Sequence, residues 1–179
     1  MKTMRQSIIL VVAFTMLTGV IYPLMVTGIA KAVFPRQANG SLIVSSEKII
    51  GSELLAQRFD DPRYFWPRPS AADYATVASG ASNKGPTSAD LAKAIGERRA
   101  KFGNDAPVDL LTASGSGLDP HISREAALQQ IERVAGIRKL PRARVEELVR
   151  EFTESPQLGI LGEPRVNVLP LNLSLDQLK

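Results

Sequence analysis

The sequence predicts an α+β protein with one N-terminal transmembrane helix followed by a single small mixed α/β domain. Three observations lead to this prediction. An apolar run without any charge extends from Gln6 to Ala30. The rest of the chain alternates short β-branched segments with helical patterns. Prolines and glycines separate these segments, and we find no internal repeat and no low-complexity region.

The apolar run is the first element. A bilayer core of ~30 Å needs about 20 apolar residues in a helix, so we expect a transmembrane helix over residues 7–34, preceded by a cytoplasmic N-terminus of residues 1–6. Pro23 is expected to kink this helix. Thr15 and Gly19 form a small-xxx-small pair. Such a pair suits packing against another membrane helix, but small residues are also frequent in lipid-facing spans.

A cleavable signal peptide is the alternative for this run, because Ala30-Lys31-Ala32 has the form of a cleavage site. The run is far longer than the ~7–15 residues of a signal h-region, which favours an uncleaved anchor in contact with membrane lipid. Basic residues flank the run on both sides, so charge alone fixes the orientation poorly. A short N-terminus kept inside is favoured.

Composition excludes several classes of function. The chain has no cysteine and one histidine, so disulfides, cysteine metal sites and multi-histidine metal sites within one copy are excluded. Setting aside the four basic residues around the apolar run leaves 18 of the 22 basic side chains, which the 18 acidic ones balance. A neutral domain with one tryptophan lacks the footprint of a nucleic-acid binder.

The domain begins with a predicted strand over residues 41–46. Residues 49–59 suit either a strand end followed by a short helix or one continuous helix, and three prolines then exclude regular structure (Pro62, Pro67 and Pro69). The segment Arg63–Ser70 holds the only tryptophan beside two other aromatic residues and two arginines. It can serve as a docking surface or as a hydrophobic plug with arginine stacked on the rings.

Residues 80–87 resemble a phosphate-binding P-loop only superficially, because Pro86 stands where that motif needs lysine. We interpret them as a turn leading to Thr87 as N-cap, with Asp90 completing the cap. The helix that follows is expected to end near Gly103.

The central loop, Thr112–Ser123, is the most specified stretch of the chain. We expect a strand over Val108–Leu111 before it and a helix capped by Ser123 after it. Apolar residues in that helix keep helical spacing (Ala126, Ala127, Ile131, Val134 and Ala135). Beyond Pro141 a second helix carries another apolar stripe (Val145, Leu148, Val149 and Phe152).

From Arg133 to Arg144 there are five basic residues and no acidic one: Arg133, Arg138, Lys139, Arg142 and Arg144. They form either a solvated corner or a surface for anionic headgroups or an acidic partner. The C-terminal tail predicts a strand with Val166, Val168 and Leu171, placed at an edge or end by Pro170. Ser174 is expected to cap a short final helix.

The central loop contains the residue types of a nucleophilic hydrolase: Ser114, Ser116, Asp119 and His121. The G-x-S-x-G elbow is absent, and an Asp and a His two residues apart do not naturally form a relay with a nearby serine. The alternative is that Asp119 and Ser123 cap the helix, that Gly115 and Gly117 allow the turn, and that His121 bonds locally.

Three stretches now support a resemblance: Tyr64–Ala71, Ala78–Pro86 and the central loop. They occur in order after a single N-terminal span, and Gly162–Leu169 follows them. Together they closely resemble the C subunit of the bacterial Kdp potassium-transporting ATPase over nearly the whole chain. Trp66 departs from the family, where Gly or another small residue is expected.

The resemblance implies a non-catalytic accessory subunit of a high-affinity, ATP-driven potassium import complex. Its partners would be a channel-like potassium subunit, a P-type ATPase catalytic subunit and a small membrane peptide. It implies a role in assembly and in raising the ATP affinity of the hydrolysing subunit, with ATP and potassium handled by the partners. It also implies a single pass of the bacterial inner membrane, with residues 35–179 forming an extracytoplasmic, periplasmic domain.

Two expectations about sites follow. Residues of the aromatic segment and the central loop, together with the small pair in the membrane helix, are candidate subunit contacts: Tyr64, Phe65, Trp66, Arg68, Asp119, His121, Thr15 and Gly19. Direct nucleotide contact by Ser114, Gly115, Ser116 and Gly117 would require a cytosolic domain. A membrane-anchored periplasmic hydrolase using Ser114 or Ser116 with Asp119 and His121 is the alternative function.

Overall fold

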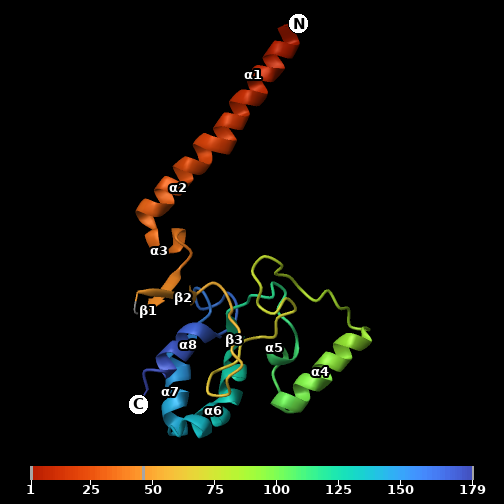
Figure 1. Ribbon diagram of the computed structural model, residues 1–179, viewed down its shortest axis with the longest axis vertical. Helices are drawn as coiled ribbons and strands as arrows, with labels where there is room; N and C mark the ends of the chain where they lie inside the picture. Colours follow the sequence, from red (N-terminus) through yellow and green to blue (C-terminus); the bar gives the residue numbers. More distant parts are fainter. Residues whose placement is uncertain (1, 46, 179) are drawn as a thin grey trace. The chain divides into compact units, whose positions relative to one another are not determined.

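The structure is a computed structural model that describes residues 2–45 and 47–178. It confirms the predicted α+β class, with an N-terminal apolar helix followed by a small domain of helices and short strands (Figure 1). The chain divides into two compact units, Met1–Ile50 and Gly51–Lys179. Each unit is described by itself.

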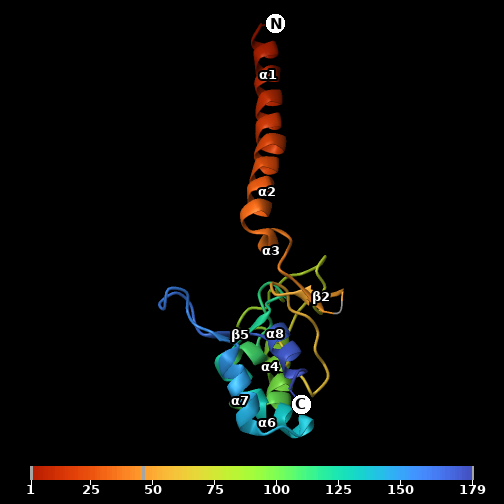
Figure 2. The same cartoon turned by 90° about the vertical axis from the view of Figure 1, so that its left-hand side faces the viewer.

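The first unit is dominated by one continuous helix from Lys2 to Val33, whose most apolar 18-residue stretch has a mean hydropathy of 2.3 and is not buried. It comprises α1 (Lys2–Met16), a π-helical segment η1 (Leu17–Ile21) and α2 (Tyr22–Val33) (Figure 2). By length and composition this helix can cross a membrane. The described helix includes residues 2–6, and the bounds of the membrane span, residues 7–34, stay a prediction.

The predicted kink lies close to a change in hydrogen bonding. The π-helical turn ends at Ile21, directly before the first turn of α2, which contains Pro23. Proline has no N–H to donate, and wide π turns are one way for a helix to accommodate it. A short helix, α3 (Pro35–Ala38), follows.

The predicted first strand is confirmed as β1 (Leu42–Ser45), which pairs with β2 (Lys48–Ser52). The helix expected within residues 49–59 is wrong. The Ser52 hydroxyl accepts the Leu54 N–H, a local turn that ends the strand without starting a helix. From residue 53 to residue 88 the described chain holds turns and bends only, as the three prolines predicted.

The second unit contains a three-stranded antiparallel sheet in the order β3-β5-β4. Its strands are β3 (His121–Ser123), β4 (Thr153–Glu154) and β5 (Arg165–Asn167). Ile122 on β3 and Thr153 on β4 both pair with Val166. The prediction of an edge strand in the tail is therefore wrong, because β5 is the central strand.

Five helices complete this unit: α4 (Ala89–Phe102), α5 (Val108–Leu111), α6 (Arg124–Arg138), α7 (Arg142–Glu151) and α8 (Val168–Leu175). Figures 1 and 2 show α6, α7 and α8 gathered on one side, and α6 and α7 are in direct contact. The predicted stripes of α6 and α7 are confirmed as core, since every member is buried except the partly buried Phe152. The rest of the core comes from distant segments: Phe65, Leu110, Ile122, Val166, Val168, Leu171 and Leu175.

Three local predictions need correction. Ser88 caps α4 by accepting the Leu91 N–H, in place of Thr87. Asn167 caps α8 through the Leu169 N–H, so Ser174 lies inside that helix together with Pro170. Both errors place a cap at the wrong one of several polar residues, a choice that short-range sequence leaves open.

The third correction concerns the entrance to the central loop. Val108–Leu111 is one turn of helix, α5, and the strand β3 lies at the end of the loop. Pro107 fixes the start of the turn, and both Leu110 and Leu111 are buried. Neighbouring residues of a strand would point to opposite faces, so a helical turn buries this pair better. The Ser123 cap of α6 is confirmed by its bond from the Ala126 N–H.

Candidate functional site

The aromatic segment Tyr64–Trp66 is held in place by two side-chain amides. Asn172 accepts the Phe65 N–H at 2.9 Å and donates to the Phe65 carbonyl at 3.0 Å. Gln130 accepts the Trp66 N–H at 2.8 Å and donates to the Trp66 carbonyl at 3.1 Å. Both amides are almost fully buried. They satisfy the backbone as a neighbouring strand would, so this irregular segment can lie against the core without orphaned groups.

Cationic side chains cover the exposed parts of this segment. The Lys101 ammonium and the Arg133 guanidinium each lie 3.7 Å from the centroid of the Trp66 ring. Burial lowers the pKa of Arg133 to about 10. The Trp66 N–H donates to the Asp61 carbonyl at 3.2 Å. Arginine stacking on rings is therefore confirmed, but the cations come from α4 and α6 and not from the segment itself.

Arg133 and Arg138, two members of the predicted basic corner, act as clamps on the aromatic segment. Arg133 donates to the carbonyls of Pro62 and Tyr64. Arg138 donates to the Arg63 carbonyl at 2.8 Å and to the Asp176 carboxylate at 2.7 Å. Arg133 and Arg138 therefore have a structural role within the chain and are not part of a solvated corner.

Two further arginines of that corner, Arg142 and Arg144, form exposed ion pairs with glutamates. Such exposed pairs add little to the free energy of folding. The structure thus pairs much of the predicted basic surface within the chain.

The three aromatic candidates for subunit contact fall into different environments. Phe65 is completely buried in the core, so its side chain is not available to a partner, and here the plug interpretation holds. Tyr64 and Trp66 are partly exposed. The Tyr64 hydroxyl donates to the Asp176 carboxylate at 2.9 Å, and that bond is the main cause of its raised pKa.

The centre of the central loop is closed around Ser114. This side chain is 1% exposed, and its hydroxyl accepts the N–H groups of Gly117 at 2.9 Å and Asp119 at 3.4 Å. Its own hydroxyl lies 3.2 Å from the Ser116 hydroxyl. The Ser114 N–H donates to the Pro69 carbonyl at 2.9 Å. The loop therefore uses Ser114 as an internal hydrogen-bond centre.

Position 117 has no room for a side chain. Its φ of +72° is a left-handed conformation, and a Cβ there would lie 2.9 Å from the Gly80 carbonyl oxygen and 3.3 Å from the Ser70 hydroxyl. Two segments that lie far apart in the sequence meet at this glycine. The loop is thus packed backbone against backbone on residues 70–80.

Asp119 links three of the predicted site residues. Its carboxylate accepts the Arg68 guanidinium at 3.0 Å and the His121 N–H at 3.0 Å, and His121 Nδ1 lies 3.7 Å from it. Partial burial by itself would raise the pKa of Asp119, but the hydrogen bonds from His121 and Arg68 outweigh it and lower that pKa to about 2. The expected helix cap by Asp119 is wrong, since it caps the turn at His121.

Ser114 is not placed as the nucleophile of a hydrolase. In the described part of the chain His121 bonds to neither serine; it is turned to Asp119, and Ser114 is buried. A nucleophile needs an adjacent base within hydrogen-bond reach and access to substrate. Neither condition is met by Ser114.

Residues 80–87, which resemble a P-loop only superficially, border a hollow of about 430 Å³. Its lining residues are Ala71, Ala81, Ser82, Lys84, Leu91, Ala94, Arg98 and Ala113. Both cations of this hollow are engaged. Lys84 lies 3.4 Å from the Asp90 carboxylate, and Arg98 donates to the Leu111 carbonyl at 2.7 Å. The hollow therefore presents no pair of uncommitted cations to a phosphate.

The remaining candidates lie in the membrane helix. Thr15 belongs to α1 and Gly19 to the π-helical turn, and nothing lies within 4 Å of a Cβ placed on Gly19. The Thr18 hydroxyl donates to the Phe14 carbonyl at 2.7 Å. These residues leave an open surface on the helix, and a role in helix packing stays a prediction.

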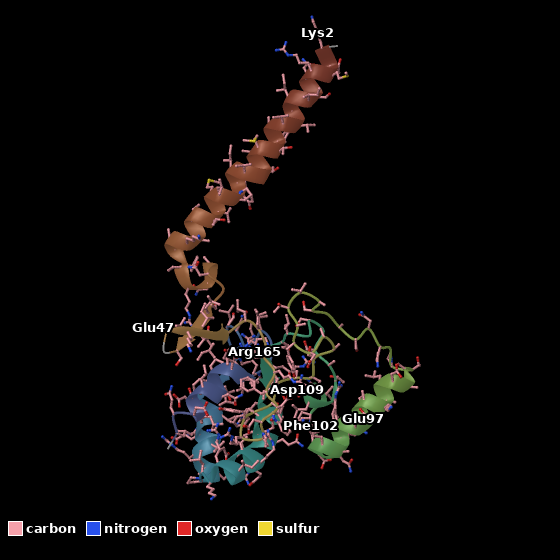
Figure 3. The ribbon with its side chains drawn as sticks, in the orientation of Figure 1. Lys2, Glu47, Glu97, Phe102, Asp109 and Arg165 are labelled. Carbon is pink, nitrogen blue, oxygen red and sulfur yellow. The ribbon has the colours of Figure 1, made fainter. Side chains whose placement is uncertain are left out.

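The residues that sequence reasoning missed are those that hold the motifs in place. Gln130, Asn172 and Asp109 carry no pattern of their own. Asp109 accepts the Ser123 N–H at 2.7 Å and the Ser123 hydroxyl at 3.1 Å, and lies beside β3 (Figure 3). The sequence feature that could have indicated Gln130 and Asn172 is an amide side chain among the apolar residues of a helix, α6 for Gln130 and α8 for Asn172.

Known proteins resemble this chain over almost its whole length. The family model for the c chain of the K+-transporting ATPase matches residues 4–177. The chain therefore belongs to this family of potassium-transporting ATPase subunits.

Its relatives cover it almost completely. A "Potassium-transporting ATPase KdpC subunit" of Methylococcus capsulatus is 53% identical over 98% of this chain and 97% of its own length. Subunits with the same description from Gemmatimonas aurantiaca and Geobacter sulfurreducens are 51% and 50% identical, each over 99% of this chain and 94% and 99% of their own lengths.

Proposed function

We propose that this chain is a non-catalytic accessory subunit of a potassium-transporting ATPase complex. It would support assembly of the complex and stimulate the subunit that hydrolyses ATP by raising that subunit's affinity for ATP. ATP and potassium would be bound by the partner subunits, which we take to be a channel-like subunit, a P-type catalytic subunit and a small membrane peptide.

The observation that carries this proposal is the closed state of the central loop. In the central loop, the family's most specific motif, the polar groups around the buried Ser114 form internal hydrogen bonds. Asp119 of this loop is paired with Arg68 of the same chain. A loop built this way is suited to hold a rigid surface. Its buried serine, Ser114, is not accessible as a nucleophile, and the N–H groups of Gly117 and Asp119 are already bonded to the Ser114 hydroxyl.

We further propose that the N-terminus is cytoplasmic and that the domain lies on the periplasmic side. The long apolar helix supports a single pass. A periplasmic domain cannot touch cytosolic ATP, so stimulation would be transmitted through the partner subunits. Tyr64, Trp66, Arg68, Asp119 and His121 remain candidate contacts in this scheme.

Topology tests the scheme first. A cysteine introduced as Val77→Cys occupies a fully exposed position, and the natural chain has no other cysteine. Labelling by a membrane-impermeant thiol reagent in intact spheroplasts is expected. A Thr3→Cys control should label only after lysis. The reverse pattern would place the domain in the cytosol and restore direct nucleotide contact by Ser114–Gly117.

Activity is tested in the assembled complex. Complexes purified with and without this chain should differ in the ATP concentration that half-saturates hydrolysis, with the chain lowering it. An isolated chain that hydrolyses ester or phosphate substrates, with activity lost in Ser116→Ala, would overturn the proposal in favour of a hydrolase.

A further inference from the structure

The loop between β4 and β5 carries an apolar cluster that faces away from the core. Leu158, Ile160 and Leu161 are 89%, 81% and 56% exposed. We call these three side chains the apolar tip. No charged residue lies between Ser155 and Gly162. Figure 2 shows this loop, in blue beside β5, extending away from the helices of its own unit.

The loop is ordered by its own backbone. Gln157 and Leu161 exchange two N–H···O=C bonds, each of 2.9 Å. Leu158 has a φ of +55°, and the glycines that follow it, Gly159 and Gly162, also have positive φ. A leucine in this conformation is uncommon and strained. A preformed hairpin loses little conformational freedom when it docks, which favours binding through its tip.

The base of the hairpin is acidic. Glu151, Glu154 and Glu163 flank it. Arg165, labelled in Figure 3, is paired with Glu154 at 2.9 Å. With the adjacent Arg150 counted, residues 150–165 carry three glutamates and two arginines, a net charge of −1. Its natural complement is an apolar groove with a basic rim.

A lipid surface fits this pattern poorly. Membrane-surface segments carry Lys and Arg for anionic headgroups and Trp or Tyr for the interface. The tip has none of these side chains, and its acidic base would be repelled.

A second copy of the chain fits no better. A stable dimer buries about 800 Å² on each partner, far more than three aliphatic side chains offer. Two identical tips would also bring their acidic bases together.

We infer that the apolar tip inserts into an apolar, basic-rimmed groove of another protein subunit of the ATPase complex. This inference rests on the proposed function, because it needs a partner subunit on the same side of the membrane as the domain. The tip would then be a docking element distinct from the aromatic segment and the central loop.

A photo-crosslinking residue at position 158 of the full-length chain, co-expressed with the other subunits in native membranes, tests the occupant. The expected product is an adduct with a different polypeptide, at least about fivefold above the yield from the same residue at position 77, whose valine is likewise exposed. An adduct with lipid, an adduct with a second copy, or a yield equal to that at position 77 would overturn the inference.

Binding strength is tested with the triple variant Leu158→Ser, Ile160→Ser, Leu161→Ser. We expect retention of the chain in the detergent-purified complex to weaken at least about tenfold, and Glu163→Lys to weaken it several-fold. Val77→Ser and Val108→Ser, which change exposed apolar side chains elsewhere, are the matched controls. Unchanged tryptophan fluorescence of the variants shows that the domain remains folded.

The outcomes separate the two proposals. If the natural chain co-purifies with the complex and the triple variant is retained equally well, the tip inference alone fails. If the natural chain does not associate with ATPase subunits at all, both the proposed function and the tip inference fail.

Discussion

Two loops of the same domain differ in which side chains they bury and which they expose. The central loop turns its polar groups inward: Ser114 is buried and bonded, and Asp119 is paired with Arg68. The hairpin between β4 and β5 turns apolar groups outward, with Leu158 and Ile160 almost fully exposed. We therefore expect the first loop to stabilise the fold and the exposed tip of the second to contribute little to it.

A segment can therefore have a distinctive sequence motif without offering its side chains to a partner, and an exposed candidate binding element can have an ordinary sequence. The central loop is the most specific motif of the chain, yet its conspicuous side chains serve its own backbone. The hairpin has an ordinary composition, and only its exposure makes it a candidate binding element. Substitutions in the two loops should therefore separate loss of stability from loss of association.

A matched pair of glycine substitutions should give the largest contrast. Gly117 and Gly159 both have positive φ, but of these two only Gly117 has backbone crowding the position that an alanine methyl would occupy, with the Gly80 oxygen 2.9 Å from it. Gly117→Ala should lower the free energy of unfolding by about 3 kcal/mol, from left-handed strain and overpacking together. Gly159→Ala should lower it by about 1 kcal/mol, from strain alone. Denaturant unfolding followed by Trp66 fluorescence measures both, and equal effects would contradict the close packing.

Removal of the Ser114 hydroxyl should have the next largest effect. Ser114→Ala removes the hydroxyl that accepts the N–H groups of Gly117 and Asp119 and leaves Gly117 only its longer bond to the Ser114 carbonyl at 3.3 Å, at a cost of about 2 kcal/mol in the free energy of unfolding. Ser116→Ala, at an exposed position, should cost less than about 1 kcal/mol. If the complex containing Ser116→Ala lost all ATPase stimulation while the domain stayed folded, the loop would have a direct role beyond structure.

Acid should weaken the central loop through Asp119. Its pKa is lowered to about 2 in the folded chain, below the unfolded value of about 3.9. The carboxylate therefore contributes stability that is present above about pH 4 and is lost as the pH falls towards about 2. With 31% of the side chain exposed, solvent screening reduces this contribution to about 1–2 kcal/mol.

The test compares the free energy of unfolding at pH 7 and pH 3. Asp119→Asn should be less stable than the natural chain at pH 7 and should lose less on acidification. Glu163→Gln on the hairpin is the control and should keep the acid loss of the natural chain. An identical pH profile for Asp119→Asn and the natural chain would show that the Arg68 pair does not stabilise the fold.

The smallest effect on stability is expected at the apolar tip. Leu158→Asn should change the free energy of unfolding by less than about 0.5 kcal/mol, because the side chain is exposed and Asn tolerates positive φ. Thermal unfolding of the purified chain in detergent checks this value. A loss above about 1.5 kcal/mol would mean that Leu158 supports its own domain and is not reserved for a partner.

Local pattern predicted the elements that are decided locally. The stripes of α6 and α7 repeat at helical spacing, and the Ser123 cap stands next to the helix that it begins. The strands β3, β4 and β5 are only two or three residues long. Segments so short carry no period, so the central position of β5 and the conversion of Val168–Leu175 to helix could not be predicted.

The candidate site shows the same division. The sequence identified Trp66, Arg68, Ser114 and Asp119 as unusual, but not what each one contacts. The fold joins Arg68 to Asp119 across 51 residues and Trp66 to Gln130 across 64. A hydrogen bond between such distant residues leaves no trace in spacing or composition.

The sequence by itself determined the long apolar N-terminal helix, which by length and composition can cross a membrane, because such a run can satisfy its backbone in lipid only as a helix. It also determined the two amphipathic helices and the family resemblance. Only the tertiary structure decided that Phe65 is buried while Leu158 is exposed. Both are apolar residues in irregular segments, and their burial depends on whether distant amides and helices are positioned to cover them.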